Sequence, residues 1–260
     1  MNVPPMRHKP APELEVCVDS LSGLHAARAG GADRIELCGA LSLGGLTPSA
    51  GLLRSATRIS VPVFVMIRPR AGNFVFSADE EDTMHRDIEA VGSAGLGGVV
   101  LGASRPDGAL DTDCLRRLLD HAKTCGLSHA TLHRAFDLTP DPLQALEQAV
   151  ALGFERILTS GGARTAATGA TTLRTLHEKA SGRITIMAGS GVTARNAASL
   201  LKETGADALH SSCRDNTSSE TAQPDNDPFG FGARPAETSE SAVRALRAAI
   251  GAFASSGENY

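Results

Sequence analysis

Short apolar segments with alternating side-chain polarity recur along the chain, separated by longer segments of helical length. Eight of these short segments have the length and composition of β-strands. We predict strands at residues 14–18, 34–37, 63–67, 98–101, 129–132, 156–159, 184–187 and 207–210. Because strands and helices alternate strictly, the sheet should be parallel, and eight units indicate a single (β/α)8 TIM barrel. An open, doubly wound sheet is the alternative, but no GxGxxG motif follows the first strand.

The junctions between these elements carry helix-capping residues. Phrases such as AGGADRIEL and LGFERILTS place glycine where a helix would end and the next strand would begin. Side chains suited to the N-cap stand at predicted helix starts, namely Ser20, Ser77, Asp111, Asp141 and Thr193. Glu80 follows Ser77 by three residues, which is the spacing of a capping box. The capping residues therefore favour the same eight-unit plan.

Two segments lie outside the repeating plan. Residues 1–12 are rich in proline and predict a flexible N-terminal tail, which leaves residues 13–254 for the barrel. Residues 214–238 are polar and rich in proline and glycine, so they predict a long flexible loop before the last helix. We expect this loop to lie over one face of the barrel.

Composition and charge exclude several classes of function. The 260-residue chain carries a net charge of −4 and has no Trp and one Tyr. Nucleic-acid binding normally requires a basic surface or aromatic platforms, so we expect no nucleic-acid partner. The N-terminus lacks the apolar core of a signal peptide, and the run VPVFVMI is too short to cross a membrane. The five cysteines are odd in number and form no CxxC pair, so we expect free thiols and a cytoplasmic location.

Polar side chains gather where the predicted strands end, which is the end that carries the site in such barrels. Side chains alternate along a strand, and Ile35 and Leu37 are expected to face the helices. The same parity turns six side chains toward the barrel interior: Cys17, Glu36, Cys38, Arg68, His133 and His210. A Glu–Arg pair that merely closes the barrel, with cysteines as ordinary core residues, is the simpler explanation. The combination on one rim favours a functional pocket.

The charged residues of this rim suggest acid–base chemistry on a small anionic metabolite. Glu36 would be the general acid or base and should pair with Arg68, because an unpaired buried carboxylate is costly. His133 would be its partner, oriented by Asp137, and His210 completes the catalytic candidates. This hypothesis describes a TIM-barrel enzyme of the isomerase, aldolase or hydrolase type, or a non-catalytic binder of such a metabolite.

Glycine-rich turns after the sixth and seventh strands predict an anion site. The segment AGSGV leads into a helix N-terminus, where free backbone N–H groups suit a phosphate or carboxylate. The anion-binding candidates are Arg70, Ser160, Gly161, Gly162, Gly189, Ser190, Gly191 and Ser211. A tight turn that requires glycine for its backbone alone is the alternative interpretation.

Eight motifs, taken in order, resemble those of a known family. They are LEVCVDS, GGADRIELC, GGLTPS, IRPRAGNFVFS, TLHRAFD, LTSGG, IMAGSGV and HSS, and they lie between residues 14 and 213. Together they are similar to the CutC family, from which the chain departs at Leu43, Ala71 and Asn73. The resemblance implies a cytoplasmic barrel protein of copper homeostasis that binds Cu(I) through cysteine.

Under this copper hypothesis, Cys17 and Cys38 are the metal ligands, since they match the family's cysteines in EVC and ELC. Both thiols would face inward from neighbouring strands, and Cu(I) prefers soft thiolates. Met66 on the third strand would add a weak thioether. No organic cofactor is implied. We expect a homo-oligomer whose partners are the copper ion and, under the alternative hypothesis, a small anionic ligand.

Overall fold

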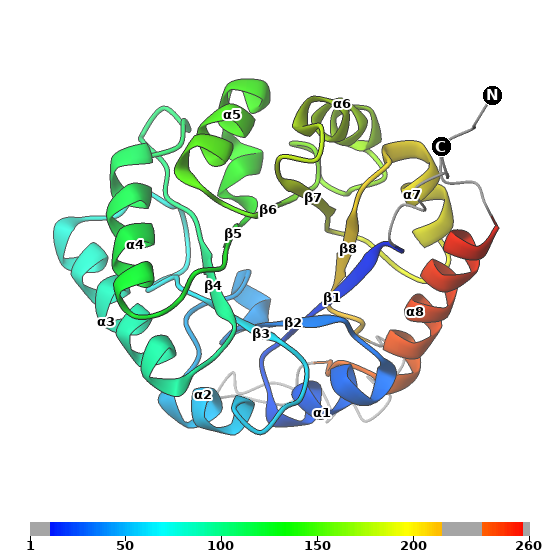
Figure 1. Cartoon of the computed structure of the whole chain (residues 1–260), viewed down its shortest axis with the longest axis horizontal. Coiled ribbons are helices and arrows are strands. Elements are labelled where there is room, and N and C mark those ends of the chain that lie inside the picture. The colour runs from blue at the N-terminus through cyan, green and yellow to red at the C-terminus, as the bar shows by residue number, and fades with distance from the viewer. Residues whose placement is uncertain (1–10, 215–235, 257–260) are drawn as a thin grey trace, which may run out of the picture.

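The computed structural model describes residues 11–214 and 236–256, in which eight parallel strands close into a barrel in the order β1 to β8 (Figure 1). The strands are β1 (Glu13–Val18), β2 (Arg34–Leu37), β3 (Val63–Met66), β4 (Gly98–Leu101), β5 (Ala130–Leu132), β6 (Arg156–Thr159), β7 (Thr185–Ala188) and β8 (Ala208–Ser211). The helices are α1 (Leu21–Gly30), α2 (Ala50–Ala56), α3 (Ala78–Ala94), α4 (Thr112–Thr124), α5 (Pro142–Leu152), α6 (Ala170–Ala180), α7 (Ala197–Thr204) and α8 (Glu240–Ser255). Two 3-10 turns, η1 (Leu41–Leu43) and η2 (Arg134–Leu138), follow β2 and β5. The predicted (β/α)8 barrel is confirmed, and each predicted strand agrees with an observed one to within one residue at either end.

Local capping determines where most of the helices begin. The predicted N-cap side chains accept backbone N–H groups of the first helical turn in four helices, at Ser20, Ser77, Asp111 and Asp141. The Glu80 side chain completes the predicted capping box at the start of α3. Thr193 was wrongly assigned as a cap, because α7 begins at Ala197 with Asn196 before it. The Thr193 N–H instead donates to the Asn196 side chain and closes a turn ahead of the helix.

The main hydrophobic core lies between the strands and the surrounding ring of helices (Figure 1). Outward-facing strand residues such as Leu14, Val16, Ile35 and Leu37 are fully buried there. Two smaller apolar clusters fill part of the barrel interior. They comprise Cys38, Phe64, Met66 and Val100 in one, and Leu158, Met187 and Ala208 in the other. The alternation of faces that the sequence predicts is therefore the one observed.

Strand register decides which inward side chains meet. Cys17 on β1 is aligned with Glu36 on β2, so Cys38 lies two residues further toward the strand ends. Glu15 is aligned with His210 on the other neighbouring strand, β8. Because β8 closes the barrel against β1, residues almost two hundred positions apart in the chain become neighbours.

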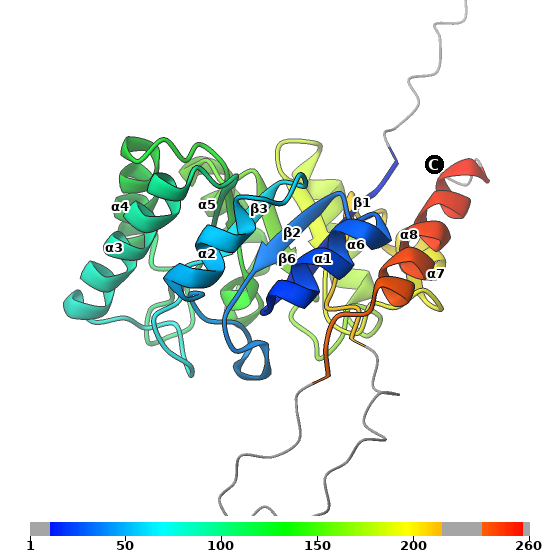
Figure 2. The same ribbon diagram turned by 90° about the horizontal axis from the view of Figure 1, so that it is seen from below.

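Figure 2 shows the barrel from the side, with β1 entering at the upper edge and α8 beginning at the lower edge. The lower edge is therefore the carboxyl end of the strands. The predicted tail lies outside the described residues, apart from 11–12, and so does most of the predicted 214–238 loop. The described ends of that loop are joined by an isolated bridge between Arg214 and Thr238. Within residues 11–214 and 236–256, no helix combines the length and apolar character needed to span a bilayer.

Candidate functional site

A cavity of about 810 Å³ lies at the carboxyl ends of the strands. Its lining includes five of the inward residues expected from the sequence, contributed by β1, β2 and β8 and by the residues that follow β3 and β5: Cys17, Glu36, Arg68, His133 and His210. All five are less than 9% exposed. The structure thus brings these distant positions together at one polar mouth.

The innermost part of this mouth is a group of three potential metal ligands, Cys17, Glu36 and His210. One ligand atom from each lies within 4.8 Å of the other two. His210 Nε2 is 3.7 Å from Glu36 Oε2. A thiol, a carboxyl and an imidazole so close together can hold a metal ion or exchange protons.

Glu15 fixes the orientation of His210 and was not among the residues expected from the sequence. Its Oε1 lies 2.8 Å from His210 Nδ1, while its Oε2 accepts a 2.6 Å hydrogen bond from Arg34 Nε. The Glu15 carboxylate is fully buried, and burial on this scale requires such partners. With Nδ1 bound to Glu15, His210 presents Nε2 to the site.

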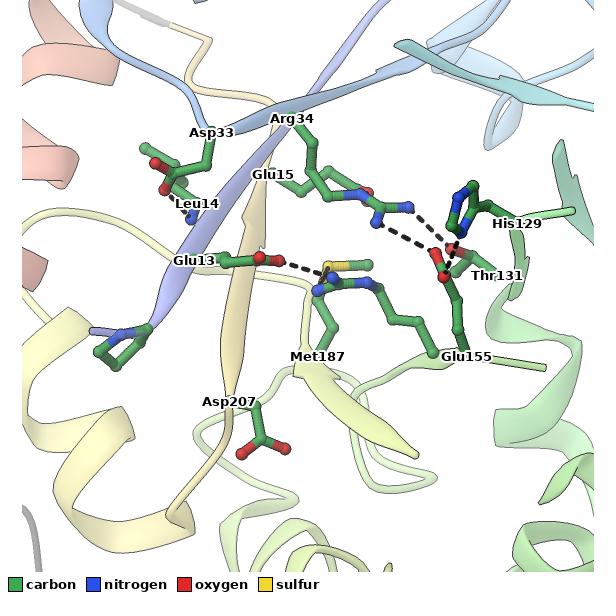
Figure 3. Close-up of polar contacts among 12 residues, drawn as sticks. Glu13, Leu14, Glu15, Asp33, Arg34, His129, Thr131, Glu155, Met187 and Asp207 are labelled. Atoms are coloured by element: carbon green, nitrogen blue, oxygen red, sulfur yellow. Dashed lines mark hydrogen bonds and ion pairs between the residues drawn. The ribbon is translucent and has the colours of Figure 1, made fainter. Parts of the chain in front are cut away.

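Glu15 belongs to a second polar layer nearer the amino ends of the strands, shown in Figure 3. Arg34 extends from Glu15 to Thr131 at 3.1 Å and to Glu155 at 3.4 Å. Its guanidinium also stacks 3.3 Å from the centre of the Phe64 ring. Strand parity alone could have found this layer, because Glu15 and Arg34 share the inward face of Cys17 and Glu36.

Burial and neighbouring charges set the protonation of the site. Burial would raise the pKa of Glu15, but the hydrogen bond from His210 and the charge of Arg34 outweigh it and lower that pKa to about 2. Burial raises the pKa of Glu36 to about 7, with the Glu15 charge adding to the rise and His210 opposing it. Burial would lower the pKa of His210, but Cys17 and Glu15 hold that pKa well above its usual value. Glu15 is therefore ionised and Glu36 titrates near neutral pH.

The second predicted metal ligand, Cys38, is not one of these three ligands, although it contacts Glu36. Its fully buried thiol donates to Glu36 Oε2 at 3.6 Å, and it packs in the apolar cluster with Met66. Burial raises the pKa of Cys38 well above its usual value, and the nearby Glu36 charge raises it further. Met66 lines the cavity, whereas Cys38 does not. The register explains this, since Glu36 rather than Cys38 stands opposite Cys17.

The predicted Glu36–Arg68 ion pair is wrong. Arg68 Nη1 donates to the carbonyls of Leu43 and Gly45, each at 3.0 Å, and Nη2 donates to Gly72 at 2.8 Å. The loop after β2 supplies the carbonyls of Leu43 and Gly45, and the loop after β3 supplies that of Gly72. Glu36 Oε1 consequently has no partner among the described residues.

His133 sits at the rim as a buried, neutral donor. The Ala135 N–H donates to its Nδ1 at 3.0 Å, which leaves Nε2 to carry the proton. That Nε2 has no partner among the described residues. Burial and the charge of Arg68 lower the pKa of His133 to about 3. Gly102 makes room for the ring, because a Cβ there would lie 2.0 Å from His133 Cε1.

Asp137 does not orient His133, contrary to the prediction. Its carboxylate accepts from Arg134 Nε at 2.8 Å, from the Ser160 N–H at 3.1 Å and from the Gly162 N–H at 3.0 Å. The Gly161 N–H is bound by the Thr159 hydroxyl. All three amides of 160–162, predicted to bind an anion, are therefore already bound within the chain, two by the Asp137 carboxylate and one by the Thr159 hydroxyl.

The remaining anion candidates divide between the cavity and the loops around it. Gly189 uses its N–H on the Thr159 carbonyl, and Arg70 turns away to Glu80 and the carbonyls of its own loop. Three of the candidates line the cavity, namely Ser190, Gly191 and Ser211. Three further arginines of the lining had not been predicted from the sequence as ligand-binding residues: Arg134, Arg195 and Arg214. Arg134 pairs with Asp137 and Arg214 pairs with Asp19, so part of this positive charge is neutralised.

Comparisons with known proteins agree with this fold. Residues 13–215 match the family model described as the CutC family. A family protein CutC from Sinorhizobium medicae is 54% identical over 93% of this chain and 97% of that protein, and one from Agrobacterium fabrum is 53% identical over 92% and 94%. A CutC crystal structure from Streptococcus agalactiae, whose name refers to copper homeostasis, has a TM-score of 0.73 and 35% identity, covering 77% of this chain and 98% of that one. Thiamine phosphate pyrophosphorylase from Pyrococcus furiosus, with a TM-score of 0.57 and 18% identity over 93% of this chain and 96% of that one, shares the fold alone.

Proposed function

This chain belongs to the CutC family, and on that premise we propose that it serves copper homeostasis by binding Cu(I) inside the barrel mouth. The name of its relative from Streptococcus agalactiae refers to that role. The observation that carries the proposal is the buried group of Cys17, Glu36 and His210, whose ligand atoms lie within 4.8 Å of one another.

Cys17 and His210 are the donors that we assign to the ion. Thiolate sulfur suits Cu(I), and imidazole is a common copper ligand. Glu15 binds His210 through Nδ1, which matches the way outer carboxylates orient ligating histidines in metal sites. We place Cys38 outside this pair because its thiol donates to Glu36.

A thiolate site of this kind requires a reducing compartment. All five cysteines of the chain are free. Thiols persist in the cytosol and are commonly oxidised outside it. We therefore place the protein in the cytoplasm.

We expect the Cys17→Ser and His210→Gln variants each to lose at least about tenfold in Cu(I) affinity, since each removes one of two donors. Cys38→Ser should retain wild-type affinity. Competition with a chromophoric Cu(I) chelator under anaerobic conditions measures all three. Affinity should also rise with pH, because both donors release protons on binding. If Cys38→Ser loses as much Cu(I) affinity as Cys17→Ser and His210→Gln loses none, the two thiolates are the ligands. If no variant loses Cu(I) affinity, copper does not bind inside the barrel mouth.

A second function, binding of a small anionic metabolite, is favoured by a different observation. The cavity of about 810 Å³ is far larger than a metal ion needs and falls within the range of small-molecule sites. Glu36 Oε1, Arg68 Nε and His133 Nε2 are buried polar atoms without a partner among the described residues, and all three residues line it. Buried polar groups are normally satisfied. Arg68 Nε and His133 Nε2 are donors and mark positions for a ligand's oxygen atoms, whereas Glu36 Oε1 fits a hydroxyl or amino group of the ligand.

We expect a carboxylate or phosphate to accept a hydrogen bond from His133 Nε2. Citrate and inorganic phosphate serve as probes, with the Nε2 resonance of nitrogen-15-labelled histidine as the readout. The His133→Phe variant should weaken probe binding by about tenfold or more, and His25→Phe on the exposed face of α1 should leave it unchanged. If His133→Phe destabilises the fold like a core truncation while probe binding persists, His133 is only part of a barrel plug.

A further inference from the structure

A second thiol–imidazole pair lies on the outside of the barrel, at the carboxyl end of α4. Cys125 follows the last residue of this helix, and its Sγ is 3.8 Å from His121 Nε2. His121 and Cys125 are one helical turn apart, so their side chains share a face. Both are accessible: the His121 side chain is 26% exposed and Cys125 is half-buried. This pair has no contact with the interior site.

Helix α3 places two polar side chains beside the pair. The His85 ring packs edge-on against His121 with 4.6 Å between centroids, and Glu89 Oε1 is 3.4 Å from His121 Nε2. His85 and Glu89 are also one turn apart. Both side chains therefore contact His121, the imidazole partner of Cys125.

Close packing of the two helix ends brings these side chains together. A Cβ at Gly92 of α3 would lie 2.5 Å from the Cys125 carbonyl oxygen and 2.9 Å from its Cβ. Only glycine allows this approach. The position of Cys125 against α3 is thus built into the backbone.

We propose that His121 and Cys125 form a solvent-accessible Cu(I) site. Metal–nitrogen and metal–sulfur bonds of about 2.0 Å and 2.3 Å let one ion join donors up to about 4.3 Å apart. The observed 3.8 Å fits this limit without moving either helix. A thiolate with imidazole is the soft donor set that Cu(I) prefers. The His121–Cys125 site is exposed to solvent, unlike the interior group. An ion can therefore bind to it and leave it without passing through the barrel mouth.

Cu(I) titration of the full-length reduced chain tests this site independently of the interior one. In a Cys17→Ser background, the protein should still bind one equivalent tightly, and adding Cys125→Ser or His121→Gln should abolish it. Cys114→Ser is the matched control, because Cys114 lies on the same helix but is buried in the core. Copper bound unchanged in the Cys125→Ser combination would overturn the proposal. If the unmutated chain binds a single equivalent and Cys125→Ser alone abolishes it, the proposed interior function is refuted and this site stands.

A readout on the unmutated chain keeps the test valid if a variant misfolds. Stoichiometric Cu(I) should slow alkylation of Cys125 by iodoacetamide at least tenfold, as measured by peptide mass spectrometry. If the Cys125–His121 contact is only a hydrogen bond, alkylation will proceed at the metal-free rate and the site does not exist. Protection by Zn(II) in place of Cu(I) would overturn the assignment of copper.

Discussion

Replacing Glu15 with alanine should lower the free energy of unfolding by about 3–5 kcal/mol, the range seen when one partner of a buried ion pair is removed. Glu15 is fully buried and binds both Arg34 and His210. Without it, two cationic side chains less than 9% exposed face each other with no carboxylate between them. Urea denaturation at neutral pH measures the loss.

Glu147→Ala is the matched control for this prediction. Glu147 also bonds an arginine, Arg183, with both contacts at 2.7 Å, but the two side chains are exposed to solvent. Exposed pairs contribute at most about 1 kcal/mol. If Glu15→Ala lowers the free energy of unfolding no more than Glu147→Ala does, water or other groups must bind Arg34 and His210. The polar layer around Glu15 is then not an ion-pair network.

The pH dependence of the Glu15 effect has a definite sign. The pKa of Glu15 falls from an ordinary 4.5 to about 2 in the folded protein. Its ionisation therefore contributes stability in full above pH 4.5, and this contribution is lost as the pH falls through 2. The difference in the free energy of unfolding between the wild type and Glu15→Ala should therefore become smaller as the pH falls from 4.5 to 2.

The fold could be predicted from the sequence because its determinants are local. Successive side chains of a strand point to opposite faces, so Leu14 and Val16 face the helices while Glu15 and Cys17 face the barrel interior. Capping pairs such as Ser77 with Glu80 set helix starts without help from distant residues. These signals repeat eight times, which favours a barrel of eight strand–helix units over an open sheet.

The site could be predicted only in part, because its contacts depend on register and loop paths. Strand ends correctly located Glu36 and His210, but no local pattern says that Cys17 stands opposite Glu36 rather than Cys38. Glu15 lies two residues before Cys17 on the same inward face of β1, so it does not stand at the strand end where sites are expected. Arg68 donates to the carbonyls of Leu43 and Gly45 because the segment after β2 folds back toward it. The path of that loop cannot be predicted from the periodicity of the side chains.

In the copper-free protein, replacing Glu36 with glutamine should raise stability at pH 8 and leave it nearly unchanged at pH 4.5. The pKa of Glu36 rises from 4.5 to about 7 because it is buried and lies near the Glu15 charge. Between these values the folded protein holds a proton that the unfolded chain has released, so stability falls as pH rises through this interval. Each pKa unit corresponds to about 1.36 kcal/mol, so at pH 8 the ionised carboxylate costs roughly 3 kcal/mol.

Glutamine has almost the same shape and cannot ionise, so it removes that cost while keeping a side-chain oxygen that can accept from the Cys38 thiol. The measurement is the free energy of unfolding of both proteins by urea from pH 4.5 to pH 8. Glu81→Gln is the control of opposite sign, because its bond with Arg117 lowers the pKa of Glu81, so its loss should destabilise the protein at pH 8. Parallel curves for wild type and Glu36→Gln would mean that the positive charge of His210 keeps Glu36 ionised throughout. The mouth would then hold a permanent carboxylate, able to bind a cation directly without first releasing a proton.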